Sequence, residues 1–65
     1  MVKWTDIEDI AIALEDVYPD EDIANIRFIK LKKMVTLLQG FNDNPDRCNE
    51  RILEAIQLKW IEERS

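Results

Sequence analysis

The sequence predicts an all-α fold in which three helices surround one core. Apolar residues recur at helical spacing in three separate segments. The 65 residues include one glycine and two prolines, too few for the turns of a β-sheet fold. Hydrophobic residues make up 46% of the chain, as in folded globular proteins. We therefore expect residues 1–65 to form a single domain that buries most of its apolar side chains.

The first predicted helix begins after Thr5 and ends before Pro19. Thr5 followed by Glu8 is a capping box, and a proline disfavours helix in the residue before it. The expected buried stripe is Ile7, Ile10, Ala11, Leu14, Val17 and Tyr18. The expected solvated face is Glu8, Asp9, Ile12, Glu15 and Asp16.

The second predicted helix covers residues 30–39. Before it, Asp20–Asp22 form a turn and Ile26–Phe28 form a possible short extended segment. Ile29 is a poor N-cap, so we expect the start to fray, whereas Gly40 is a suitable C-terminal cap. The expected buried stripe is Leu31, Met34, Val35 and Leu38.

The third predicted helix runs from about Pro45 to about Glu62. Asn44 is a good N-cap, Pro45 suits the first helical position, and Asp46 complements the helix dipole. The expected buried face is Asn49, Ile52, Leu53, Ile56 and Trp60. Leu58 and Ile61 fall outside it, so this end is either broadly buried or offers an apolar contact surface. The aromatic residues expected to fill the core are Trp4, Phe28, Phe41 and Trp60.

The charge balance indicates the kind of partner. A net charge of −5 argues against general nucleic-acid binding and favours a cation or a basic protein surface. A single cysteine excludes an internal disulfide, which favours a reducing compartment. The sequence shows no secretory leader, and no apolar run approaches the roughly 20 residues of a membrane span. We expect a cytoplasmic monomer.

Catalysis is poorly supported by the residue types present. The chain has no histidine, the commonest general base, and no glycine-rich phosphate loop. A helix N-terminus could activate Cys48, but Asp46 and Glu50 oppose a thiolate there by like charge. We expect Cys48 to be inert and half-buried, and the protein not to be an enzyme.

Carboxylates could bind a hard cation such as Fe²⁺, Fe³⁺, Mn²⁺ or Ca²⁺. Asp46, Glu50 and Glu54 are spaced four apart, which predicts one helix row, and Asp43 lies just before it. Side chains on an open surface can share a cation but cannot enclose it, so binding should be weak. The alternative is a solvated acidic face.

The basic residues are concentrated in one segment that contains no acid: Arg27, Lys30, Lys32 and Lys33. This cluster predicts a dipolar molecule with one basic edge. An alternative function, nucleic-acid binding, would depend on it.

Several short motifs occur together in one order. They are WTD at Trp4–Asp6, YPD at Tyr18–Asp20, Arg27–Phe28, Phe41, Asp43, Pro45, and NE.ILEAI...W from Asn49 to Trp60. In this order and spacing the chain resembles the IscX (YfhJ) family, small acidic proteins of bacterial iron–sulfur cluster assembly.

The resemblance implies a compact three-helix domain with a modified winged-helix shape and no catalytic activity. It implies an adaptor or regulator that binds cysteine desulfurase, with other iron–sulfur assembly proteins as further partners, and that binds iron weakly through an acidic surface. The family's acidic positions match Asp6, Asp20, Asp22, Asp43, Glu50 and Glu54; with Asp46 they are the candidate iron ligands. The candidate partner-binding residues are Glu50, Glu54, Glu8, Asp9 and Asp16. The alternative is a winged-helix-like nucleic-acid-binding module using Arg27–Lys33, although a likeness of shape does not carry DNA binding with it.

The chain departs from the family pattern in three places. Asn42 and Asn44 flank a single Asp43 where the family usually has a run of aspartates. Cys48 replaces a serine, and Ile23 stands where a proline is frequent. The diluted acidic loop should weaken iron binding more than desulfurase binding, which can use the helix faces.

Overall fold

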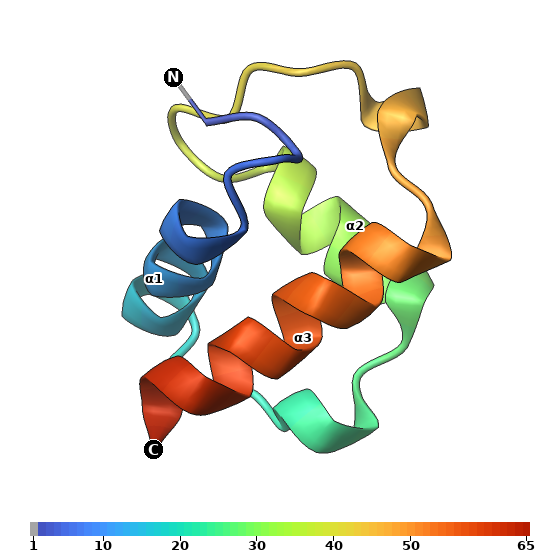
Figure 1. The fold of residues 1–65 in the computed structure, drawn as a ribbon. Helices are drawn as coiled ribbons and strands as arrows, with labels where there is room; N and C mark the ends of the chain where they lie inside the picture. Colours follow the sequence, from blue (N-terminus) through green and yellow to red (C-terminus); the bar gives the residue numbers. More distant parts are fainter. Residues whose placement is uncertain (1) are drawn as a thin grey trace.

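The computed structural model describes residues 2–65 and consists of helices joined by short connections. In chain order the elements are α1 (Ile7–Val17), the 3₁₀ turn η1 (Ile23–Asn25), α2 (Phe28–Thr36), the 3₁₀ turn η2 (Pro45–Arg47) and α3 (Glu50–Arg64). The C-terminal ends of α1 and α3 lie at the same end of the molecule (Figure 1). The all-α three-helix prediction is confirmed.

β structure within residues 2–65 is limited to one isolated parallel bridge between Val2 and Phe41. Val2 N donates to Gly40 O (2.9 Å), and Asn42 N donates to Val2 O (2.8 Å). Gly40 has φ of +90°, a conformation that side chains with a Cβ rarely adopt, so glycine allows the turn that brings Phe41 beside Val2. Ile26–Phe28, where the sequence predicts a possible short extended segment, takes no part in this bridge.

The ends of α1 and α2 differ from prediction. The N-cap of α1 is Asp6, with no side-chain cap, so the Thr5–Glu8 capping box is wrong. Before α2, Ile26 and Arg27 are extended and Phe28 is already helical. At its other end Leu37 is the C-cap, so Gly40 belongs to the following turn and not to the helix end. The predicted stop of α1 before Pro19 is confirmed.

The third predicted helix is divided into two elements. Asn44 Oδ1 accepts from Asp46 N (2.9 Å), so this cap and Pro45 start a helical turn as predicted, but only the single turn η2. The backbone is then extended at Cys48 and Asn49. Asn49 Oδ1 accepts from Ile52 N (2.9 Å) and starts α3 as a second cap. Asn49 is therefore exposed, not part of the buried face, because its side chain is used as a cap.

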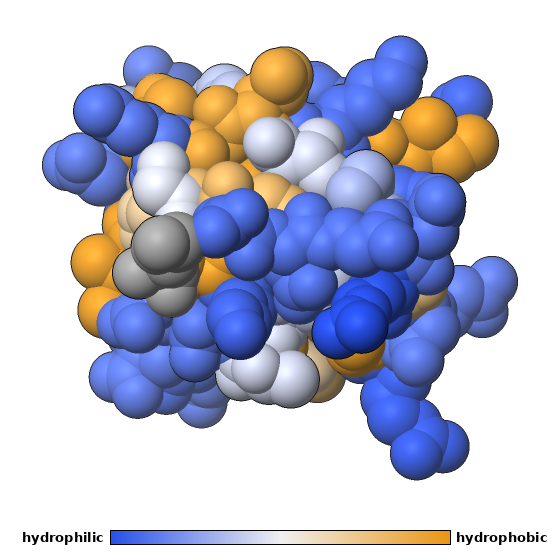
Figure 2. All heavy atoms as spheres, turned by 90° about the horizontal axis from the view of Figure 1, so that it is seen from above, coloured by the Kyte–Doolittle hydropathy of each residue, from blue (hydrophilic) through white to orange (hydrophobic). Residues whose placement is uncertain are grey.

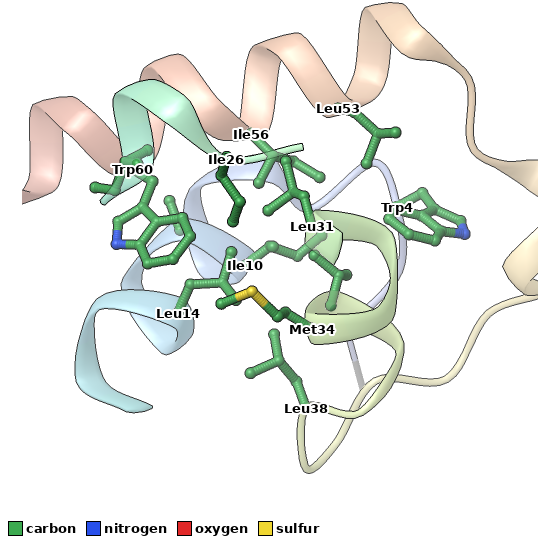
Figure 3. Close-up of a cluster of buried hydrophobic side chains, with 13 residues drawn as sticks. Trp4, Ile10, Leu14, Ile26, Leu31, Met34, Leu38, Leu53, Ile56 and Trp60 are labelled. Carbon is green, nitrogen blue, oxygen red and sulfur yellow. The ribbon is translucent and has the colours of Figure 1, made fainter. Parts of the chain in front are cut away.

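One hydrophobic core lies between the three helices, with Trp4 and Trp60 at its two ends (Figure 3). Both indoles are buried, and Phe41 meets Trp4 edge-on at 4.9 Å between ring centroids. Phe28 and Phe41 are half-buried against the core. The buried residues are Trp4, Ile10, Ala11, Leu14, Ile23, Ile26, Leu31, Met34, Val35, Leu38, Leu53, Ile56 and Trp60. Val17, predicted to be buried, is 56% exposed at the last turn of α1. Leu58 and Ile61 are exposed, so that end of α3 offers apolar surface.

Candidate functional site

The outward face of α1 is acidic and carries no basic side chain. Glu8, Asp9 and Asp16 are exposed on it, and Ile12 among them is 48% exposed. Glu8, Ile12 and Asp16 are four residues apart and form one helix row, with Asp9 beside it. We call Glu8, Asp9, Ile12 and Asp16 the acidic face of α1.

A shallow hollow adjoins this face between α1 and the end of α3. It is lined by Asp9, Ile12, Ala13, Glu15, Asp16, Pro19 and Glu63. Glu63 comes from α3 and was not recognised in the sequence, since only the packing of the two helices brings it to α1. The hollow combines carboxylates with apolar side chains, which suits the apolar stem and cationic head of lysine or arginine.

Glu15 has a different environment from its neighbours on α1. Its Oε1 accepts hydrogen bonds from Trp60 Nε1 and Arg64 Nε, both at 2.9 Å. The expectation that Glu15 lies on a solvated face is therefore wrong: the side chain is half-buried. Packing of α1 against α3 places a buried indole N–H and a cation beside the carboxylate, and both need a partner.

Arg64 ties the end of α3 to the segment after α1. Its Nη2 donates to Tyr18 O (2.9 Å) and its Nη1 donates to Glu21 O. The guanidinium also lies 5.7 Å from the ring centroid of Trp60, within range of a cation–π interaction. Arg64 thus connects α3 to Glu15, which lines the hollow, and to the chain on both sides of Pro19.

Three of the candidate iron ligands accept hydrogen bonds from nearby backbone or side-chain N–H groups. Asp6 Oδ2 accepts from Lys3 N (2.9 Å), and Asp22 Oδ2 accepts from Asn25 Nδ2 (2.8 Å). Asp43 accepts from Trp4 N (3.2 Å) and from Asn44 N (2.7 Å). The hydrogen bond from the Trp4 backbone, followed by that from Asn44, lowers the pKa of the Asp43 carboxyl below its usual range.

The other four candidate ligands are exposed but are dispersed. Asp20 lies after α1, Asp46 lies in η2, and Glu50 and Glu54 lie one turn apart on α3. The predicted helix row is wrong for Asp46, because the extended residues Cys48 and Asn49 separate η2 from α3. Within residues 2–65, no three acidic, cysteine or histidine side chains come together in a group that could hold a metal ion.

The end of the molecule that carries the Val2–Phe41 bridge and the loop before α3 is largely hydrophilic, with hydrophobic patches toward its margins (Figure 2). Cys48 is half-buried, as expected, and packs against the core. It precedes the N-cap of α3 instead of lying in the first turn. Its chemical inertness stays a prediction.

The basic cluster lies on and just before α2. Arg27 is the N-cap of α2, and Lys30 Nζ forms an ion pair with Glu21 Oε2 at 3.0 Å. The exposed Ile29 lies between Arg27 and Lys30 in the sequence. The nucleic-acid hypothesis stays a prediction, and an apolar side chain among the cations does not favour it.

None of the helices within residues 2–65 has the length and apolar character that a membrane span requires.

Comparisons with known proteins agree with the resemblance seen in the sequence. A family model described as iron–sulphur cluster assembly matches residues 2–65. An uncharacterised protein of Pseudomonas aeruginosa is 46% identical over 63 residues, which cover 97% of this chain and 96% of that protein.

Proposed function

The chain belongs to the iron–sulphur cluster assembly family, and from this premise we propose that it is a non-catalytic adaptor that binds a cysteine desulfurase through acidic surface. The acidic face of α1 is the observation that carries the proposal. Its three carboxylates are exposed and surround the exposed Ile12. A basic patch on a partner would find carboxylates for its cations and apolar atoms for their stems.

Glu50 and Glu54 supply a second acidic contact in this proposal. Both are exposed, while Leu53, Ile56 and Trp60 on the other side of α3 are buried. Charge changes at these two positions therefore act on the surface without disturbing the core. The α1 and α3 groups belong to different helices, so they can be tested separately.

An accessory role fits the chemistry that the chain offers. It contains no histidine, and its one thiol is half-buried. The proposal accordingly assigns the desulfurase and the assembly machinery the chemical steps, and assigns this chain a role in binding and regulation. We also place it in the cytoplasm, with that machinery.

Iron enters the proposal as a transient ligand. Exposed carboxylate oxygens match the hard-donor preference of Fe³⁺ and are acceptable to Fe²⁺. The dispersed ligands do not fit an enclosed, resident metal. We therefore propose weak binding centred on Glu50 and Glu54, which adjoin each other along α3.

The test is a calorimetric titration of purified cysteine desulfurase with the full chain. Neutralising the acidic face of α1 with Glu8→Gln, Asp9→Asn and Asp16→Asn should weaken binding by about tenfold, since each lost exposed charge pair is worth up to about 1 kcal/mol. The matched control removes three charges elsewhere, with Asp20→Asn, Asp46→Asn and Glu62→Gln. Equal weakening by both sets of substitutions would show that binding depends on the net charge of the chain and not on the acidic face of α1. Absence of binding by the unaltered chain would refute the desulfurase proposal.

Iron dependence is tested in the same titration with Fe²⁺ and then with a chelator. If the adaptor responds to iron, chelation should change the affinity for the desulfurase. Unchanged affinity would leave a desulfurase adaptor for which iron binding is incidental.

A further inference from the structure

The outer face of α2 is basic and apolar at the same time. The helix buries Leu31, Met34 and Val35 toward the core. Ile29 and Leu37 point away from it and are 76% and 78% exposed, more than any other large hydrophobic residue described. Lys33 stands midway between them, so Ile29, Lys33 and Leu37 form one row at i, i+4 and i+8.

The charge around this row is positive. Arg27 and Lys33 are exposed, Lys32 is half-exposed, and α2 contains no acidic residue. Of the four basic residues in the cluster, Lys30 alone forms an ion pair within residues 2–65, with Glu21. The chain as a whole has a net charge of −5, so this positively charged face is opposite in sign to the protein as a whole.

We propose that the outer face of α2 is a docking surface for an acidic amphipathic helix of a partner protein. The partner would place apolar side chains on Ile29 and Leu37, and carboxylates beside Lys32 and Lys33. The row from Ile29 to Leu37 spans about 12 Å, so roughly two helical turns of the partner cover it.

Two other occupants fit this face less well. Nucleic acid would leave Ile29 and Leu37, the two most exposed large hydrophobic side chains described, beside phosphates with which they form no favourable contact. An anionic membrane would repel most of the remaining surface of a chain with net charge −5. An acidic amphipathic helix satisfies both the apolar row and the cations.

The proposal does not depend on desulfurase binding. That binding is assigned to acidic residues on α1 and α3, whereas this surface is on α2. Together the two surfaces would let one small chain contact a basic and an acidic protein at once.

The test is an NMR titration of the isotope-labelled full chain with a synthetic peptide of about four helical turns, with leucines along one face and glutamates beside them. Amide shifts should concentrate in α2. Ile29→Ser with Leu37→Ser should weaken binding at least about tenfold, because burial of both apolar side chains is lost. Lys32→Glu with Lys33→Glu should weaken binding by a similar factor.

The matched control is Leu58→Ser, which removes a leucine that is 64% exposed on α3 and should change the affinity less than about twofold, as expected of a surface residue outside the contact. A peptide with serine in place of leucine should bind at least about tenfold more weakly, since it cannot bury apolar surface. Circular dichroism of each variant verifies that the helices remain.

The competing occupants are measured in parallel with duplex DNA and with anionic phosphatidylserine vesicles. Tighter binding to either than to the peptide, lost in the Lys32→Glu and Lys33→Glu variant, would overturn the proposal. Shifts centred on α1 or α3, or peptide binding unaffected by the serine substitutions, would overturn it as well.

Discussion

Trp60 Nε1 donates a 2.9 Å hydrogen bond to Glu15 Oε1, the same oxygen that accepts from Arg64 Nε. A carboxylate in the last turn of α1 therefore satisfies a buried indole N–H near the end of α3. The residues are 45 positions apart in sequence, so the contact exists only when the two helices pack. Glu15 also lines the α1–α3 hollow beside the acidic face.

Glu15→Ala should destabilise the fold by about 1–3 kcal/mol, because it leaves a buried N–H without a partner. Urea unfolding monitored by tryptophan fluorescence measures the change. Asp16→Ala, at the neighbouring exposed position, is the control and should change the free energy of unfolding by less than about 0.5 kcal/mol. Equal effects at both positions would contradict the role assigned to Glu15.

Trp60→Ala should cost about 3–5 kcal/mol, as truncations of large buried aromatics do. The Trp60 side chain is completely buried, and its removal leaves a cavity where α1 meets α3. The cost follows from equilibrium unfolding in urea. A loss below about 1 kcal/mol would show that the ring contributes little to the core.

Asp43 should contribute a pH-dependent part of the stability. The hydrogen bond from Trp4 N, and then that from Asn44 N, lower the pKa of its carboxyl in the folded state. The stabilisation is therefore fully present above the unfolded-state pKa of about 4 and is lost as the pH falls through the lower folded-state pKa. Asp43→Asn should reduce the difference in Tm between neutral and strongly acidic pH. An NMR titration that finds the carboxyl pKa at or above 4 would contradict this prediction.

Reversal of Glu50 and Glu54 to lysine should weaken desulfurase binding strongly while the helical circular dichroism stays unchanged. Wild-type affinity should also fall between low and physiological salt, since exposed charges are screened over about 8–10 Å. Lys32→Glu with Lys33→Glu is the opposite reversal and should leave this binding unchanged or slightly tighter. If only the lysine reversal abolishes desulfurase binding, the basic edge is the surface that the desulfurase uses.

Iron binding should be weak and should not require the thiol. Titration with Fe²⁺ should broaden NMR signals around Glu50 and Glu54, and Glu50→Gln with Glu54→Gln should remove the broadening there. Cys48→Ser should leave it intact, because the side chain is half-buried against the core. Broadening confined to Cys48 and its neighbours would indicate thiolate ligation instead.

The sequence by itself determined the helical stripes and the ends that depend on local chemistry. Leu31, Met34 and Val35 are buried as their spacing predicts, and Pro19 follows the end of α1. These features follow from the period of the helix and from the backbone restriction of proline, which do not depend on distant residues. The acidic face of α1 was predictable for the same reason, whereas the half-buried position of Glu15 was not.

Only the tertiary structure decided which acidic side chains are available. Asn44 and Asn49 are both good N-caps, and local sequence does not say whether one helix or two elements follow. Trp4 docks on this loop through Asp43 and through the carbonyl of Asn44, across 39 and 40 positions of the chain. Because two elements form, Asp46 does not lie in one row with Glu50 and Glu54. Packing of α1 against α3 brings Glu15 into a hydrogen bond with Trp60 and places Glu63 beside α1. Periodicity specifies which side of a helix is buried, but the partners of a polar group depend on how distant segments pack.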